Sequence, residues 1–195
     1  MNKYSFFTIL YLLYCKVRGF FVFRNARIIR FPIDIRGKKF MKVKRGMTTG
    51  KGCRMEAFST YKGCCLTIGV NFQMNDYVHI TAMESVYIGD NVLIASKVYI
   101  SDCSHGSYAG DERDSNPLTS PIERPLFSNP VVIKDNVWIG EFVSVLPGIS
   151  IGEGSIIGAN SVVTRSIPPY VIAVGAPAVP IKKFNFETQN WEKII

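Results

Sequence analysis

Residues 133–163 read IKDNVW IGEFVS VLPGIS IGEGSI IGANSV V, and an aliphatic residue opens every group of six. An α-helix repeats every 3.6 residues and a half-buried strand every two, so neither explains a period of six. Six residues is the period of a parallel β-helix, in which each hexapeptide forms one side of a triangular prism. We therefore predict that the repeated aliphatic side chains point into a narrow core. The residue after each of them should lie at a corner, where a small side chain lowers the steric cost.

The same period runs through residues 68–100. Its inward positions are Ile68, Met74 and Ile80, followed after two extra residues by Ile88, Ile94 and Ile100. Residues 33–46 contain two short β-prone runs that end in glycine, and these predict an earlier, less regular coil. Over residues 103–131 the period is absent and the segment is rich in Gly, Pro and Asn. A long irregular segment inside a regular repeat is usually functional, so we predict a loop there that protrudes from the prism.

Several motifs accompany the repeat, and their order along the chain is specific. They are Ile88-Gly-Asp-Asn-Val-Leu-Ile-Ala, Ser101-Asp-Cys-Ser-His-Gly, Val137-Trp-Ile-Gly, Val145-Leu-Pro-Gly, Ile157-Gly-Ala-Asn-Ser-Val-Val-Thr, Ile167-Pro-Pro and Gly175-Ala-Pro-Ala. With these motifs the chain resembles the hexapeptide-repeat acyltransferases. The resemblance is strongest to the galactoside and maltose O-acetyltransferases and to the O-acetyltransferases of bacterial surface-polysaccharide synthesis. It implies left-handed coils and a homotrimer with active sites between subunits.

The expected fold is all-β: a left-handed parallel β-helix of hexapeptide repeats with an N-terminal helical segment and a protruding loop. We divide the chain into a basic, aromatic N-terminal helical segment (residues 1–30), a β-helix acyltransferase domain (31–185, with loop 103–131) and a C-terminal tail (186–195). A chain of 195 residues, 47% hydrophobic, is long enough for one such core. Its five cysteines form no C-x-x-C pair, so neither a disulfide framework nor a zinc site is indicated, and a reducing, cytoplasmic compartment fits.

Positive charge is concentrated in the N-terminal third. Residues 1–60 hold fourteen Lys and Arg against two acids, whereas residues 61–195 hold nine against thirteen. The apolar, aromatic run that starts at Tyr4 is interrupted by Lys16 and Arg18, so it is too short to span a bilayer and lacks a signal-peptide cleavage site. Basic residues beside Phe and Tyr suit a segment, residues 1–23, that lies in the interface of an anionic membrane. The alternative is a helix that packs on the end of the prism or on a neighbouring subunit. No nucleic-acid-binding motif accompanies the charge, so we expect no nucleic-acid partner.

His105 lies where the period stops and the long loop begins. Acetyl transfer to a hydroxyl needs a base for the hydroxyl proton, and histidine titrates near neutrality. An isolated histidine in a polar loop is more often a surface residue, but the family resemblance places the catalytic base here. Its orienting partner is open between Asp102, an acid of the loop such as Glu123, and a main-chain carbonyl. The other histidine, His79, is expected at the outer surface. The β-helical carbonic anhydrases bind their metal with three histidines contributed by two subunits. This chain has two histidines, and they do not form an H-x-x-x-x-H pair, so we predict no metal.

The resemblance also implies residues that bind the two substrates. For the acceptor sugar it points to Asn75 and Trp138. Asn75 could instead be a corner asparagine that satisfies its own backbone, and Trp138 could simply cover the outer face of the prism. For acetyl-CoA it points to a groove between adjacent prisms. The candidates there are Gly140, Ala159 and Thr164 for the pantetheine arm, and Arg165, Lys182 and Lys183 for the nucleotide phosphates, although exposed basic residues are often plain surface charges.

Together these features predict a cytoplasmic O-acetyltransferase, with a peripheral position at the inner face of the membrane as an option. It transfers acetyl from acetyl-CoA to a hydroxyl of a sugar or lipid-linked glycan in lipopolysaccharide O-antigen or capsule synthesis, directly and with His105 as base. Two alternatives stay open. One is an N-acetyltransferase of a nucleotide-linked amino sugar, and the other is a non-catalytic β-helix that organises glycan assembly.

Overall fold

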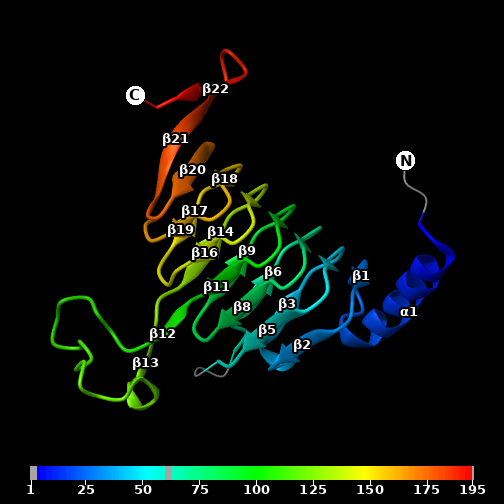
Figure 1. Ribbon diagram of the computed structural model, residues 1–195, viewed down its shortest axis with the longest axis horizontal. Helices are drawn as coiled ribbons and strands as arrows, with labels where there is room; N and C mark the ends of the chain where they lie inside the picture. Colours follow the sequence, from blue (N-terminus) through cyan, green and yellow to red (C-terminus); the bar gives the residue numbers. More distant parts are fainter. Residues whose placement is uncertain (1–3, 60–62, 195) are drawn as a thin grey trace.

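The computed structural model describes residues 4–59 and 63–194, and most of them lie in a three-sided parallel β-helix (Figure 1). Each coil places one short strand in each of three sheets, here called A, B and C. Sheet A contains β1 (Ile28–Ile29), β4 (Thr48–Thr49), β7 (Gln73–Met74), β10 (Leu93–Ile94), β15 (Trp138–Ile139), β18 (Ile156–Ile157), β20 (Val171–Gly175), β21 (Ala178–Asn185) and β22 (Asn190–Lys193). Sheet B contains β2 (Ile33–Arg36), β5 (Cys53–Ala57), β8 (His79–Ala82), β11 (Tyr99–Ser101), β16 (Ser144–Val145) and β19 (Val162–Val163). Sheet C contains β3 (Met41–Val43), β6 (Leu66–Ile68), β9 (Val86–Ile88), β14 (Val131–Ile133) and β17 (Ser150–Ile151), and a short 3-10 helix, η1 (Lys38–Phe40), precedes β3.

The chain passes within each coil from sheet C to sheet A and then to sheet B, which defines three edges: C/A, A/B and B/C. The interior is a stack of aliphatic side chains at the predicted six-residue positions. Parallel register sets Ile94 between Met74 and Ile139, and Ile139 next to Ile157. All four side chains are at most 1% exposed. Burial of such a stack stabilises by roughly 25 cal/mol per Å² of apolar surface, and this joins one coil to the next.

The corners impose two separate requirements. The first corner residue follows the inward aliphatic. A Cβ on Gly89 would lie 2.8 Å from the main-chain nitrogen of Asp135 in the next coil, so the close approach of the coils excludes a side chain there.

The left-handed conformation falls two residues later, and Asn71, Asn91 and Asn136 adopt it along the C/A edge (φ 56, 57 and 59°). Asparagine tolerates this conformation. The amides also form a ladder, because Asn71 donates to Asn91 (3.2 Å) and Asn91 to Asn136 (3.4 Å).

The two extra residues after Ile80 lie at the B/C edge. The buried carboxylate of Asp102 accepts hydrogen bonds there from the main-chain N–H groups of Met83, Glu84 and Ser85 (2.8, 2.8 and 2.7 Å). One carboxylate of the next coil therefore fixes the irregular corner that the change of spacing indicated.

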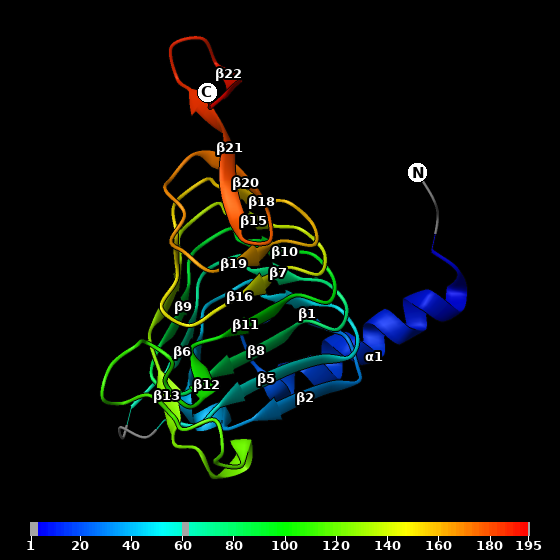
Figure 2. The same cartoon turned by 60° about the vertical axis from the view of Figure 1, so that its left-hand side comes forward.

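The long interruption of the repeat begins and ends with an antiparallel pair, β12 (Cys103–His105) and β13 (Leu126–Ser128). Both strands leave the prism at the B/C edge. The residues between them, which include the short 3-10 helix η2 (Pro121–Glu123), extend away from the sheets, and the N-terminal helix lies on the other side of the prism (Figures 1 and 2).

Helix α1 (Phe6–Val22) precedes the first coil and packs on β1. The hydroxyl of Ser5 caps it by accepting the N–H of Thr8 at 3.2 Å. A Cβ on Gly19 would lie 3.2 Å from that of Ile29, so glycine permits the close contact of helix and strand. Because β1 already pairs with β4, the prism begins inside the stretch 1–30 that the sequence assigned to the helical segment. Residues 1–3 of that stretch lie outside the described residues.

The C-terminal strands reverse direction. β21 pairs antiparallel with β20, and β22 with β21, which extends sheet A past the last coil. The rings of Tyr170 and Phe184 each pack edge to face on Phe186 (centroids 5.0 Å apart), and Phe184 also packs on Trp191 (5.3 Å). Residues 190–193 of the segment predicted as a tail therefore form a strand. Its packing depends on aromatic pairs rather than on the six-residue period, so the period did not reveal it.

Candidate active site

His105 is the last residue of β12, and its side chain is exposed where the hairpin leaves the prism. It stands opposite Leu126 of β13. Its carbonyl accepts a hydrogen bond from the Tyr108 hydroxyl at 2.6 Å, which fixes the main chain at the start of the loop. The imidazole is thus held on a paired strand and is accessible to a substrate or to a second chain.

Within residues 4–59 and 63–194, the His105 imidazole has no hydrogen-bond partner, and His105 bonds only through its main chain. Both carboxylate oxygens of Asp102 are bonded to the main chain at the B/C edge, so this candidate for orienting the imidazole belongs to the fold instead. Glu123 is exposed in η2, and within residues 4–59 and 63–194 no hydrogen bond joins it to His105. Cys103 lies on the same face of β12 as His105. Partial burial raises the pKa of its thiol, so this sulfur stays protonated near neutral pH and is a poor nucleophile.

Asn75 stands at the A/B edge, directly after β7. Its main-chain N–H donates to the Ile94 carbonyl (2.9 Å) and its carbonyl accepts from the Cys53 thiol (3.0 Å). The residue is exposed and lines a hollow of about 420 Å³, together with Arg30, Gly50, Lys51, Asp76 and Ser96. Among the described residues, no side-chain bond ties Asn75 to its own backbone, which was the alternative to a binding role. From the sequence, Arg30 and Lys51 were recognised only as two of the basic residues of the N-terminal third. Nothing in the six-residue repeat indicated that they lie beside Asn75.

Trp138, Gly140 and Ala159 lie near the same edge in later coils. Trp138 points outwards from sheet A and is 49% exposed, in one row with Ile156 of the next coil. A Cβ on Gly140 would lie 2.7 Å from the main-chain nitrogen of Ala159, so the packing of coils alone requires glycine there. Ala159 is exposed and small. The A/B edge therefore presents an aromatic ring beside a strip with little side-chain cover.

Thr164 and Arg165 lie on the other side of sheet B. They follow β19 directly, at the B/C edge, and both are exposed. This is the edge from which the His105 hairpin leaves the prism. The pantetheine candidates are therefore divided, with Gly140 and Ala159 on one edge and Thr164 on the other.

Lys182 and Lys183 are consecutive residues of β21. Consecutive side chains of a strand point to opposite faces, so the two ammonium groups cannot both contact one phosphate group. Lys182 pairs with Ile172, whose row continues through Ile156 to Trp138. Lys182 is thus the lysine on the face that carries the tryptophan.

The candidate residues fall into two groups on opposite edges of sheet B. Asn75, Gly140 and Ala159 follow the A/B edge, and His105 and Thr164 follow the B/C edge. About five residues of extended chain separate the edges within a coil, which is about 16 Å at 3.3 Å per residue. One chain therefore does not bring Asn75 and His105 to the same sugar hydroxyl.

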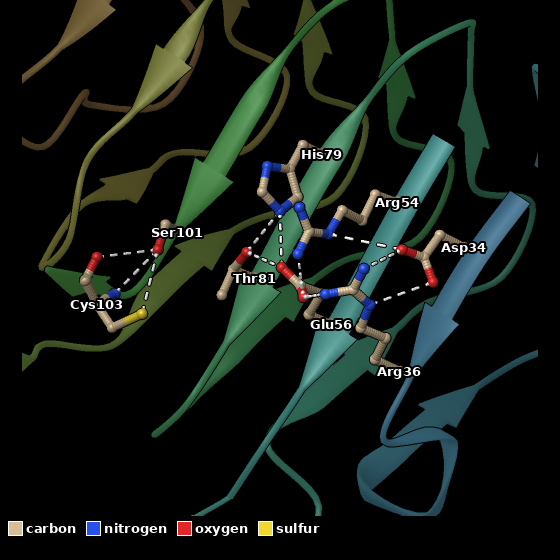
Figure 3. A network of polar contacts seen from close by, with 8 residues as sticks. All are labelled: Asp34, Arg36, Arg54, Glu56, His79, Thr81, Ser101 and Cys103. Atoms are coloured by element: carbon tan, nitrogen blue, oxygen red, sulfur yellow. Dashed lines mark hydrogen bonds and ion pairs between the residues drawn. The ribbon is translucent and has the colours of Figure 1, made fainter. Parts of the chain in front are cut away.

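The outer face of sheet B, between these edges, carries an ionic network (Figure 3). Its centre is Glu56, 9% exposed, which accepts hydrogen bonds from Arg54 (2.6 Å) and Arg36 (3.1 Å) and lies 3.0 Å from Nε2 of His79. Burial alone would raise the pKa of Glu56, but the hydrogen bonds from His79 and Arg54 outweigh it and the pKa is lowered. His79 does point outwards, as expected, and it is also held by Thr81 (2.9 Å). In the described part of the chain, no three His, Cys, Asp or Glu side chains gather as metal ligands would.

Comparison with known proteins relates this geometry to a family. The family model "Bacterial transferase hexapeptide (six repeats)" matches residues 130–165. The chain is 48% identical over 171 residues to an Escherichia coli K12 protein assigned to lipopolysaccharide biosynthesis as the O-acetyl transferase WbbJ, which covers 88% of this chain and 86% of the relative. It is 34% identical over 164 residues to the galactoside O-acetyltransferase of the same strain, covering 82% of this chain and 75% of the relative.

Solved structures agree with the sequence relatives. A galactoside acetyltransferase in complex with coenzyme A matches with a TM-score of 0.58 at 33% identity, over 81% of this chain and 74% of that one. A maltose O-acetyltransferase from Clostridium difficile 630 matches with a TM-score of 0.54 at 26% identity, over 93% and 90%. The chain belongs to the hexapeptide-repeat acyltransferase family.

Proposed function

We propose that this protein transfers acetyl from acetyl-CoA to a sugar hydroxyl in lipopolysaccharide O-antigen or capsule synthesis. Family membership supports this, and it also gives the coils a left-handed sense. Further support comes from the 48% identity to a relative named for lipopolysaccharide biosynthesis and from coenzyme A bound to a solved galactoside acetyltransferase. The observation that carries the proposal is the division of the base and the binding residues between the two edges of sheet B.

A site that needs both edges is built from two chains. In a ring of three, each chain offers its A/B edge to one neighbour and its B/C edge to the other, so three equivalent sites form. The outer face of sheet B, with the network around Glu56, then faces the threefold axis. His105 of one chain reaches the edge of the next chain that carries Asn75, Gly140 and Ala159. Thr164 and Arg165 would reach the same donor groove from the side of His105.

His105 acts in this site as a general base. It takes the hydroxyl proton while the sugar oxygen bonds to the acetyl carbon, and the carbon–sulfur bond then breaks. The imidazolium returns that proton to the departing sulfur of coenzyme A. Main-chain N–H groups at the coil corners are suited to stabilise the negative oxygen of the intermediate. Transfer is direct in this proposal: the Cys103 sulfur lies 3.5 Å from the Ser101 hydroxyl, and in the described part of the chain no hydrogen bond joins it to a base.

Release of free coenzyme A thiol with matched pairs of hydroxyl and amino sugars tests the proposal. We expect thiol release that depends on the hydroxyl sugar, because a general base can take the proton of a hydroxyl that is already positioned beside the thioester. Release with only the amino member of a pair would favour the N-acetyltransferase. No release with any free, nucleotide-linked or lipid-linked sugar would favour the scaffold and contradict the proposal.

We further propose that α1 holds the enzyme at the cytoplasmic surface of a membrane. Cys15 and Gly19 are buried against the prism, whereas the opposite side of the helix exposes Phe6, Ile9, Leu10, Leu13, Val17, Phe20 and Phe21. An apolar patch of this size marks a contact with another molecule. The first acid of the chain is Asp34, so the charge around the helix is positive and suits anionic lipids. Within residues 4–59 and 63–194, no helix is long and apolar enough to cross a bilayer.

Glutamate at both Leu13 and Val17 is expected to release the protein from vesicles that contain anionic lipid. These side chains are 57% and 64% exposed, so the substitutions leave the packed side of the helix intact. Each removes about 1.5 kcal/mol or more of apolar contact with lipid and adds repulsion. Co-sedimentation measures the effect. A double glutamate at Leu118 and Ile122, exposed apolar residues of the loop, is the matched control, and equal sedimentation of the two variants would contradict the proposal.

A further inference from the structure

Two hollows meet at the A/B edge of the first coils. The first is the hollow that contains Asn75. The second, of about 370 Å³, lies along the N-terminal half of α1 and is lined by Tyr4, Phe7, Thr8, Tyr11 and Leu12. Arg30 and Lys51 line both. The two hollows therefore adjoin at these two residues. Taken together they are called the depression, which is polar at Asn75, cationic in the middle and largely apolar along the helix.

With respect to residues 4–59 and 63–194, the two cations at the junction retain free donors. The ammonium of Lys51 lies 4.8 Å from the centroid of the Tyr11 ring, and its main-chain N–H donates to the Asp76 carboxylate (2.7 Å). The Nη1 of Arg30 donates to the Thr49 carbonyl (3.1 Å), which leaves its other guanidinium N–H groups. No ion pair in the described part of the chain engages Arg30 or Lys51. Two cations against Asp76 leave the depression with net positive charge.

We propose that this depression binds the acceptor as a sugar linked to a lipid phosphate or diphosphate. The sugar lies at Asn75, the phosphate between Arg30 and Lys51, and the lipid chain along α1. Guanidinium and ammonium groups form charge-assisted hydrogen bonds to phosphate oxygens, and these are the strong ones. The inference rests on the proposed function, since that places an acceptor at Asn75. It narrows the acceptor from free, nucleotide-linked or lipid-linked sugars to the lipid-linked class, and it adds two residues that select this class.

A nucleotide-linked sugar shares the sugar and the phosphates but ends in a polar base. The helical end of the depression favours the lipid. Phe7, 79% exposed, lines it, and the apolar side of α1 continues from there to Phe21. A base would need several directional partners, whereas a hydrocarbon chain needs only apolar surface. The same apolar side suits a membrane, which is where a lipid-linked sugar resides.

Calorimetric binding of farnesyl diphosphate to the full chain, with the ligand kept monomeric, tests the inference. We expect farnesyl diphosphate to bind at least about tenfold more tightly than inorganic diphosphate, farnesol or UDP, because each of these lacks one part of the ligand. Lys51→Gln and Arg30→Gln should each weaken the binding of farnesyl diphosphate by about tenfold or more. Lys97→Gln is the matched control. Lys97 also lies over an aromatic ring, that of Phe142 at 4.7 Å, but lines neither hollow, so binding should be unchanged.

A second pair of variants tests the lipid end. Phe7→Ser should weaken the binding of farnesyl diphosphate and leave the binding of inorganic diphosphate unchanged. Phe21→Ser, at the far end of the same helix, should change neither. Equal losses in both variants would mean nonspecific adhesion to α1, and UDP that binds more tightly than farnesyl diphosphate would assign a nucleotide. Either result would overturn the inference. Because the assay needs no acetyl transfer, absence of farnesyl diphosphate binding beside sugar-dependent thiol release would overturn it and leave the proposed function standing.

Discussion

Replacement of His105 by alanine is expected to lower kcat/KM for a sugar acceptor by about 10³-fold, within the range that loss of a general base usually costs. The imidazole is exposed at the end of β12, and the hydrogen bond from Tyr108 goes to its main chain. The substitution therefore removes the base without removing core contacts. Thiol release at saturating acetyl-CoA measures the rate, and thermal unfolding shows that the fold is retained.

His79→Gln is the matched control for that experiment. Glutamine keeps an amide that can bond to Glu56, and His79 lies in the network on sheet B rather than at the B/C edge. We expect kcat/KM to stay close to that of the unmodified protein. A loss with His79→Gln as large as that with His105→Ala, or full activity of His105→Ala, would remove His105 as the base.

Two inactive variants are expected to restore each other when they are mixed. The pair is His105→Ala, which lacks the base, and Ala159→Glu, which places bulk and negative charge in the groove proposed for anionic coenzyme A. If each site takes His105 from one chain and Ala159 from the next, random mixing in equal amounts makes about one site in four intact. Activity should therefore rise from near zero to about a quarter of the unmodified value after co-refolding.

The arrangement of the site decides the outcome of this mixing. A site built within one chain would always contain one of the two substitutions, so mixing would restore nothing. Copies of the two variants that carry different affinity tags, co-purified after mixing, provide the calibration for chain exchange, which then does not depend on how the site is built. A mixture that stays inactive although the calibration shows exchange would contradict the two-chain site and, with it, the threefold arrangement around sheet B.

The coils could be predicted because they are local in sequence. The inward stack from Ile133 to Val163 repeats at a fixed spacing, and a fixed spacing needs no knowledge of distant contacts. The end of the period likewise marks the start of the loop beside His105, but the assignment of this residue as candidate base depends on the family resemblance. The left-handed conformation of the asparagines at the C/A edge was harder to predict. The six-residue pattern marks only the aliphatic positions, whereas tolerance of a positive φ is a property of asparagine itself.

What could not be predicted depends on contacts between distant residues. Asp102 was a candidate for orienting His105 because the two are close in sequence. Its carboxylate instead bonds to residues 83–85 of the preceding coil, which no local pattern indicates. Arg30 and Lys51 are twenty-one positions apart and meet beside Asn75 only when α1 and the first coils pack. Lys182 and Lys183 were both candidates for the nucleotide phosphates through the family resemblance, yet the strand that contains them points their side chains to opposite faces.

The two ends of the prism have a consequence for its tendency to polymerise. A stack of parallel coils presents unpaired strand edges at its first and last coil, and such edges are templates for further chains. Here α1 packs against β1 at one end, and the reversed strands β21 and β22 continue sheet A in a direction that no coil can follow. The last strand of sheet B, β19, is only two residues long. At sheet A, these terminal elements therefore occupy the positions at which the strands of a further chain would have to pair.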